Sequence, residues 1–134
     1  MAGFEYRGTT SNTVPTPALD VVCDDTYWTT AQPNDVVAVN GSGKVIAAAA
    51  STAGAGIFGV VAAKEFIREK GDVKTIKVRT DRNAKYEAVI AAGTPVLFGQ
   101  YEITADGKVD ASKTTNKAVK VLEVRNGTAI VQLL

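Results

Sequence analysis

The stretch "GAGIFG", residues 54–59, has the spacing G-x-G-x-x-G by which many proteins bind the pyrophosphate of a dinucleotide. That chemistry requires a buried strand running into the first glycine and a helix after it, so that backbone amides point at the phosphates. A helix could be drawn through "VVAAKEFIREKG", the strand-like "VKTIKVRT" follows, and Asp81 stands where a ribose-binding acid is expected. The spacing alone is a weak signal in a chain with 12 glycines.

The residues around these glycines favour a strand. The preceding "AAAASTA" is small and weakly strand-forming, and the apolar block of residues 57–61 is almost continuous instead of forming a helical stripe. Its β-branched valines also favour extended structure. We therefore predict that "GIFGVVAA" is a buried strand joined to "VKTIKVRT" by the polar turn "REKGD". The glycines would then relieve crowding where the alanine-rich linker meets the strand.

Other residues that could do chemistry are few. The chain has no histidine, which removes the commonest general base and metal ligand, and its single cysteine, Cys23, cannot form an intrachain disulfide. "GSGKV" lacks the first glycine and the Ser/Thr of a phosphate loop. Four carboxylates near Tyr27 and Trp28 could form a cation or sugar site, but their spacing is not that of a calcium loop, and a solvated loop is the preferred interpretation. These carboxylates are Asp20, Asp24, Asp25 and Asp35. We assign no catalytic, cofactor-binding or metal-binding residue and predict that the protein is not an enzyme.

The balanced composition limits the classes of partner. Of 134 residues, 15 are basic and 14 acidic, without a basic stripe, whereas nucleic acids and anionic membranes attract concentrated positive charge. No apolar run approaches the roughly 18 to 20 residues that span a bilayer. The start "MAGFEYRG" lacks the basic and apolar regions of a secretory signal. We expect a soluble, cytoplasmically made, single-domain protein with no nucleic-acid or membrane partner.

The elements that must position any site are mostly β-hairpins. Strand-forming residues flank four turn sequences, at residues 40–43, 81–83, 106–107 and 126–127. They predict a mainly β fold, a compact antiparallel β-barrel or sandwich built from hairpins, with little helix.

A short internal similarity accompanies these hairpins. "NGSGKVIAA" at residues 40–48 resembles "TADGKVDAS" at residues 104–112, with the shared Gly-Lys-Val displaced by 64 residues, from 43 to 107. Each follows an apolar stretch predicted to be a strand, residues 36–39 and 96–98. Two related β units and a chance similarity between two hairpins are both open interpretations.

The first 32 residues are predicted to form an extended N-terminal arm and linker, and residues 33–134 the β-barrel-like domain. The segment is rich in Thr, Ser, Gly and Pro, and Pro15 and Pro17 favour extended backbone. Phe4 and Tyr6 are unusual for a disordered tail because aromatic side chains seek burial. They dock either on their own domain or on a partner or neighbouring subunit.

The order of five phrases along the chain resembles the small capsid decoration, or cement, proteins of tailed bacteriophages. These phrases are "NDVVAVNGSGKVIAAAA", "AGAGIFGVVAAKE", "AAGTPVLF", "ITADGKVDAS" and "KAVKVLEVRNGTAIVQLL", within residues 33–134. The resemblance implies a structural virion protein, commonly a homotrimer, on the outer surface of the assembled capsid, where it stabilises the shell by bridging subunits of the major capsid protein. It also implies that "GIFGVV" is a buried strand and that no cofactor is needed.

The arm matches these proteins only in character, and it supplies the hypothesis for capsid or inter-subunit contact. The residues expected to make this contact are Phe4, Tyr6, Arg7, Val14, Pro15 and Pro17. Deletion of residues 1–17 is then expected to leave a folded domain with weaker capsid binding. The alternatives are another phage structural β module, such as a tail- or fibre-associated module or an adaptor, and, third, a small nucleotide-binding domain.

Overall fold

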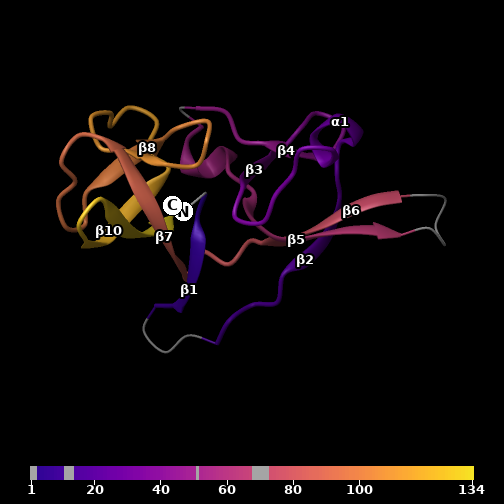
Figure 1. The fold of residues 1–134 in the computed structure, drawn as a ribbon, viewed down its shortest axis with the longest axis horizontal. Helices are drawn as coiled ribbons and strands as arrows, with labels where there is room; N and C mark the ends of the chain where they lie inside the picture. Colours follow the sequence, from indigo (N-terminus) through magenta and orange to yellow (C-terminus); the bar gives the residue numbers. More distant parts are fainter. Residues whose placement is uncertain (1–2, 11–13, 51, 68–72) are drawn as a thin grey trace.

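The computed structural model of the chain is mainly β, with two antiparallel-rich sheets in a compact, sandwich-like arrangement (Figure 1). It describes residues 3–10, 14–50, 52–67 and 73–134. In Figure 1 the purple and magenta sheet occupies the right side of the molecule and the orange and yellow sheet the left. The predicted fold class is confirmed.

The first sheet is built from residues 19–79. Its strands are β2 (Leu19–Val22), β3 (Val36–Val39), β4 (Val45–Ala47), β5 (Gly59–Ile67) and β6 (Val73–Arg79), in the order β2-β6-β5-β3-β4. The short helix α1 (Asp25–Trp28) and the 3-10 turn η1 (Gly54–Gly56) lie in the connections. A parallel bridge between Cys23 and Val45 brings the two outer strands together, so the sheet curls towards a barrel.

The second sheet combines residues 84–133 with one strand from the N-terminus. Its strands are β1 (Glu5–Thr9), β7 (Ala84–Ala92), β8 (Gln100–Ile103), β9 (Val109–Asp110), β10 (Val119–Val124) and β11 (Thr128–Leu133), in the order β1-β7-β11-β10-β8-β9. Strand β9 also pairs in parallel with β7. This pairing closes the strands β7 to β11 in the way that the Cys23 bridge closes the first sheet.

The two sheets share one topology, so the fold is an internal duplication. We call residues 19–79 the first repeat and residues 84–133 the second repeat. In each, the first strand pairs with the last, the last with the fourth, the fourth with the second and the second with the third. The hairpin registers also correspond, because Val39 opposite Val45 in the first repeat matches Ile103 opposite Val109 in the second. Of the two interpretations of the Gly-Lys-Val similarity, the structure supports two related units.

Irregular backbone features are duplicated as well. The fourth strand of each repeat, β5 or β10, carries a bulge at the same place in its pairing with the last strand. Asn34 (φ 78°) and Phe98 (φ 63°) are the non-glycine residues with positive φ in the described chain, and each lies just before the second strand of its repeat. Their amides donate to equivalent carbonyls, Asn34 to Val61 at 2.8 Å and Phe98 to Val121 at 2.7 Å. Asn34 and Phe98 are therefore equivalent positions.

Three of the four predicted hairpins are confirmed: β3–β4, β8–β9 and β10–β11. The fourth prediction is wrong. Residues 81–83 turn the chain, but β6 and β7 belong to different sheets, so this turn is the crossover between the repeats. The Arg82 guanidinium in this crossover donates to the carbonyl oxygen of Ile57, and the Gln132 side chain donates to the Arg82 carbonyl at 2.6 Å. Local turn residues reverse the chain both in the three hairpins and in this crossover. Whether a hairpin forms depends on which strand the next segment pairs with.

The stretch "GAGIFG" leads into strand β5, so the strand predicted for "GIFGVVAA" is confirmed from Gly59 onward and is wrong for residues 56–58. Its first three residues form η1, and β5 begins at Gly59. The glycines permit close packing: a Cβ on Gly54 would lie 2.6 Å from the Cβ of Leu134, and one on Gly59 would lie 2.3 Å from the carbonyl oxygen of Arg79. Strand β5 pairs with β6, and the predicted turn at residues 68–72 lies outside the described residues.

Residues 4–9 belong to the second sheet, which corrects the expectation that the N-terminal segment lies outside the core. Strand β1 pairs antiparallel with β7, with Tyr6 opposite Tyr86. Phe4 is fully buried, and its ring centroid lies 5.9 Å from that of Tyr86. The physical reason is that Phe4 and Tyr6 bury aromatic surface against Tyr86, which a solvated arm would leave in water.

The expected boundary between arm and domain at residue 33 does not coincide with a structural boundary. Strand β2 pairs with β6 over residues 19–22, and α1 follows it, so both belong to the first repeat. Between β1 and β2, the described residues 14–18 form no regular structure and are mostly exposed. This short linker is the part of the segment that keeps the extended, solvated character predicted for an arm.

Two hydrophobic clusters follow the duplication. The smaller fills the first repeat, with Cys23, Val37, Val45, Val61, Ile76 and Val78 as its buried members. The larger fills the second repeat, and it includes Phe4 together with Val36, Ala48, Ile57 and Val60 from the first repeat. Because its members come from both repeats, the two halves share an apolar core and form one body.

Candidate functional site

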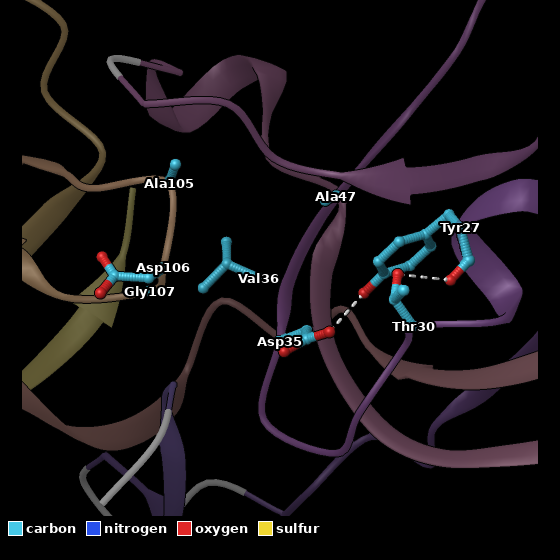
Figure 2. A pocket seen from close by; sticks show the side chains of 8 residues that line it. All are labelled: Tyr27, Thr30, Asp35, Val36, Ala47, Ala105, Asp106 and Gly107. Carbon is cyan, nitrogen blue, oxygen red and sulfur yellow. Dashed lines mark hydrogen bonds between the residues drawn. The ribbon is translucent and has the colours of Figure 1, made fainter.

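A cleft of about 300 Å³ lies between the two repeats (Figure 2). The first repeat contributes Tyr27, Thr30, Asp35, Val36 and Ala47, and the second contributes Ala105, Asp106 and Gly107 from the turn between β8 and β9. The cleft brings two carboxylates, Asp35 and Asp106, and the hydroxyl of Tyr27 to one place, and such groups could serve as acid or base in catalysis. We therefore consider its chemistry first.

Tyr27 is positioned in the cleft by the single turn of α1. The Asp24 carboxylate caps this turn by accepting the Tyr27 amide at 3.1 Å. The Tyr27 hydroxyl donates to Asp35 Oδ2 at 2.7 Å, the bond drawn in Figure 2, and the Gln32 amide donates to the same oxygen at 3.0 Å. Burial, reinforced by the bond to Asp35, raises the pKa of Tyr27 above its ordinary value. The phenol stays protonated and ties α1 to the loop before β3.

Asp106, on the opposite wall, is also engaged in local structure. It accepts from the Thr104 hydroxyl at 2.5 Å and pairs with Lys108 at 3.3 Å. The Thr104 bond, followed by the contact with Lys108, lowers the pKa of Asp106. In Figure 2 its carboxylate points away from Tyr27 and Asp35. General acid–base catalysis favours a pKa near neutrality, whereas the pKa of Asp106 is lowered. The contacts of Asp106 with Thr104 and Lys108 stabilise the turn between β8 and β9.

The acidic cluster considered in the sequence is distributed over separate structural contacts. Asp20 and Asp25 each pair with a lysine of β6, at 3.0 and 3.9 Å, while Asp24 caps α1 and Asp35 binds Tyr27. Within the described residues, no group of three or more potential ligands is placed to hold a metal ion. The geometry gives no support to the cation or sugar alternative.

The residues of the dinucleotide alternative also have structural roles. Strand β5 follows the glycines, so no helix N-terminus faces the position that a pyrophosphate would need. Asp81, in the ribose-binding position of that alternative, accepts the amides of Thr16 at 3.1 Å and Asn83 at 2.8 Å. These two amides lower the pKa of Asp81. The carboxylate fixes the crossover and the linker to β2.

Three consecutive apolar residues are exposed in the turn that precedes β8. Val96, Leu97 and Phe98 are 61%, 55% and 63% exposed, and we call them the 96–98 turn. The prediction of a strand here is wrong, because the chain turns with Phe98 at positive φ. The Val96 amide donates to the Tyr101 hydroxyl at 2.9 Å and the Phe98 amide to Val121, so the backbone holds the turn in place. An exposed apolar run held in this way marks a candidate interaction surface.

A shallow hollow of about 280 Å³ lies on the first repeat. It is lined by Val39, Ala55, Gly56, Ile57 and Phe58, all apolar or glycine, and we call it the Val39 hollow. Val39 is 41% exposed and immediately precedes the turn of residues 40–43. Gly41 and Gly43 in that turn have open space where a Cβ would stand.

The structure separates the predicted contact residues into different environments. Phe4 lies in the core, so in this fold it is not available to a partner. Tyr6 packs edge-on against Tyr86 with the Arg79 guanidinium 3.7 Å from its ring centroid, and Arg7 pairs with Glu87 at 3.1 Å. These three residues attach β1 to its own sheet.

The remaining predicted contacts lie in the linker. Val14 is 82% exposed, and Pro15 and Pro17 are also exposed. These three residues are accessible to a partner, and the hypothesis that they touch one stays a prediction. The sequence did not indicate the 96–98 turn as a candidate surface, because an apolar triplet in isolation is typical of a strand. The flanking Pro95 and Gly99 were the available signal for a turn.

No protein-family model, curated protein or solved structure matches the chain. Among the helices that the structure describes, none is long and apolar enough to cross a membrane.

Proposed function

We propose that this chain is a structural virion protein that binds the outer surface of an assembled phage capsid and stabilises the shell by bridging major capsid protein subunits. The observation that supports the proposal is the succession of strand and turn phrases over residues 33–134, combined with the compact β fold that these residues form. The phrase "GIFGVV" leads into a buried strand, in keeping with what the resemblance implies.

The surface of the molecule suits such a role. The 96–98 turn offers exposed apolar groups on a β framework, which can bury them against a partner at a small cost in ordering, and Val14 offers a further exposed apolar group in the linker. The shared core across the two repeats transmits load through one body. Many copies, each with a modest interface, together raise the free energy needed to open the shell. Self-association into a trimer belongs to the same proposal.

Cosedimentation with empty expanded capsids tests the proposal. Wild-type protein should pellet with capsids and saturate at a fixed ratio to the major capsid protein, and the capsids should resist heating or chelation better than bare shells. Protein that stays in the supernatant at saturating concentration would contradict the proposal. The measurement uses the full chain, because deletion of residues 1–17 removes Phe4 from the core and confounds binding with stability.

The linker contacts are tested separately by point variants that leave the core intact. A triple variant Val14→Ser, Pro15→Ser, Pro17→Ser changes exposed residues alone, and Val124→Ser, at a 46% exposed position in β10, is the matched control. Weaker capsid occupancy of the triple variant, with a normal thermal midpoint, supports a linker contact. Unchanged occupancy overturns that contact without affecting the proposed function.

A tail- or fibre-associated β module or an adaptor is the second candidate, favoured by the same exposed apolar turn. Binding to purified tails in place of capsids would support it. Titration with NAD or ATP by calorimetry tests the nucleotide alternative. Heat of binding at millimolar ligand would revive it, and no heat would leave it without support.

A further inference from the structure

The duplication shows which surfaces of each repeat are covered inside the chain and which are left open. In the first repeat, the turn at Asn34 is covered by the N-terminus: the Phe4 amide donates to the Asn34 carbonyl at 2.9 Å, and Gly3 packs against the same carbonyl. In the second repeat, the equivalent residue Phe98 is 63% exposed. One member of this equivalent pair has a partner in the chain, and the other presents an aromatic ring to solvent.

The second equivalent pair shows the reverse distribution. Gly107, in the β8–β9 turn of the second repeat, is buried beside Gly3. A Cβ added to Gly107 would lie 3.1 Å from the Cα of Gly3. Its equivalent in the first repeat, Gly43, is exposed with open space around it. Inside the chain, the loop before β3 therefore faces the β8–β9 turn across the cleft of Figure 2. The two surfaces left over are the loop before β8, with the 96–98 turn, and the β3–β4 turn of residues 40–43.

The leftover surfaces are an apolar projection and a shallow hollow lined by apolar side chains and glycine. The 96–98 turn projects three apolar side chains, and the Val39 hollow beside the β3–β4 turn is lined by apolar residues and glycine. The absence of a Cβ on Gly41 and Gly43 lets a ring approach the backbone of that turn closely. Val39 at the hollow and the three residues of the 96–98 turn are exposed in the described part of the single chain.

Phe98 also carries a conformational cost: the bond from its amide to the Val121 carbonyl holds the backbone in place, while its exposed side chain gains little burial in return. A bulky residue at positive φ is disfavoured, whereas asparagine, the residue at the equivalent position in the first repeat, tolerates it. An exposed phenylalanine with positive φ goes against the backbone preference of its residue type at a surface position. Strained backbone of this kind clusters at functional sites, held there by the surrounding structure.

We infer that copies of this chain associate head to tail, with the 96–98 turn of one copy seated in the Val39 hollow and against the β3–β4 turn of the next. Within one molecule, the loop before β3 of the first repeat faces the β8–β9 turn of the second. The inferred contact places the equivalent loop, before β8, against the equivalent turn, β3–β4, of the next molecule. It uses two different surfaces on each copy, so it is a heterologous interface, the kind that generates a ring where its rotation closes and a filament where it does not. The inference deepens the proposed function by naming the surface through which subunits join, and it rests on that function only for the expectation of a closed trimer.

The variant Phe98→Asn tests the inference with its fold protected, because the equivalent Asn34 already occupies the same backbone conformation. Sedimentation velocity and light scattering over a concentration series should show self-association of the wild type and an association constant lowered about tenfold or more in the variant, the loss expected for one aromatic side chain. The thermal midpoint of the dissociated variant should equal or exceed that of the wild-type monomer. Val14→Ala is the control for loss of an exposed apolar side chain elsewhere. A wild type that remains monomeric, or a variant that associates like the wild type, overturns the inference.

Cysteine cross-linking identifies the two surfaces directly. Mixing Leu97→Cys protein with Ser42→Cys protein under mild oxidation should give a disulfide-linked pair, since the two positions face each other across the inferred contact. Asp106→Cys replaces Ser42→Cys in the matched control, because it occupies the equivalent position in the other repeat. Equal cross-linking of Leu97→Cys with both partners would contradict the inference.

Capsid cosedimentation of the Phe98→Asn variant separates this inference from the proposed function. Cross-linked, associating protein that ignores capsids would leave the inference standing and refute the proposed function. If the wild type binds capsids but its self-association does not depend on Phe98, the proposed function stands and the inference is refuted.

Discussion

Replacement of Phe4 by alanine tests the largest difference between the sequence interpretation and the structure. Phe4 is fully buried at the start of β1, with its ring centroid 5.9 Å from that of Tyr86. A residue on a solvated arm would tolerate this change. A core residue loses the transfer free energy of its ring and leaves a cavity behind.

The expected magnitude follows from the burial and the position of Phe4. Buried Phe→Ala substitutions cost about 3 to 5 kcal/mol. We expect about 3 kcal/mol, the lower end, because β1 is terminal and its detachment limits the loss to the free energy of docking that strand. With an m-value of about 2 kcal/mol/M, the midpoint of urea unfolding should fall by about 1.5 M.

Two measurements separate global from local effects. Equilibrium urea unfolding can be followed by the fluorescence of Trp28, the single tryptophan, together with far-UV circular dichroism. Trypsin cleavage after Arg7 reports on β1 itself, and it should accelerate up to about a hundredfold in Phe4→Ala if detachment limits cleavage. Val14→Ala, at a position 82% exposed, should leave both readouts at their wild-type values.

The reasoning would be refuted by a specific result. If Phe4→Ala unfolds within about 0.3 M urea of the wild type and is cleaved after Arg7 at the wild-type rate, β1 does not contribute a core residue. The N-terminal segment would then be the arm expected from its composition, and the deletion of residues 1–17 would again be a clean test of capsid binding.

Three further outcomes follow from the packing and charges. Gly59→Ala should lose about 1 to 3 kcal/mol in a denaturation series because its Cβ would meet a carbonyl of β6, while Gly41→Ala, in open space, should stay within about 0.5 kcal/mol of the wild type. Tyr86→Phe should be neutral or stabilising by up to about 1 kcal/mol, because the buried hydroxyl has no hydrogen-bond partner among the described residues; a clear loss of stability would reveal one. The pKa of Glu87 is lowered by the Thr128 hydroxyl and then by two arginines, so its contribution is present above the unfolded pKa and lost as pH falls through the lower folded value. Urea midpoints measured as the pH is lowered should therefore decline less steeply for Glu87→Gln, and identical profiles would contradict this role.

Much of the fold could be predicted from local sequence because turns and strands are local chemistry. The glycine-containing turns before Lys44 and Lys108 and at residues 126–127 permit the positive φ that hairpins need, and each formed a hairpin. The valine-rich block after Gly56 indicated a strand in place of a dinucleotide-binding helix, and β5 confirms it. The absence of histidine is a property of composition that required no coordinates.

The candidate surfaces could not be predicted in the same way. A stretch such as residues 96–98 has the same apolar letters whether it pairs in a sheet or turns at the surface, because burial depends on which distant strand lies beside it. Phe4 likewise has no local signal for burial, since its environment is supplied by Tyr86 on a strand far along the chain. The crossover at residues 81–83 has the letters of a hairpin turn but joins different sheets.

The sequence by itself determined the class of fold, the positions of most turns, the strand that follows "GAGIF" and a brief similarity between two Gly-Lys-Val stretches. Only the tertiary structure turned that similarity into a duplication, because strand order is a set of pairings between residues far apart in sequence. It also decided that Asn34 and Phe98 are equivalent and that one is covered while the other is exposed. The physical reason is that a side chain's type is local, whereas its solvent exposure is set by everything that folds around it.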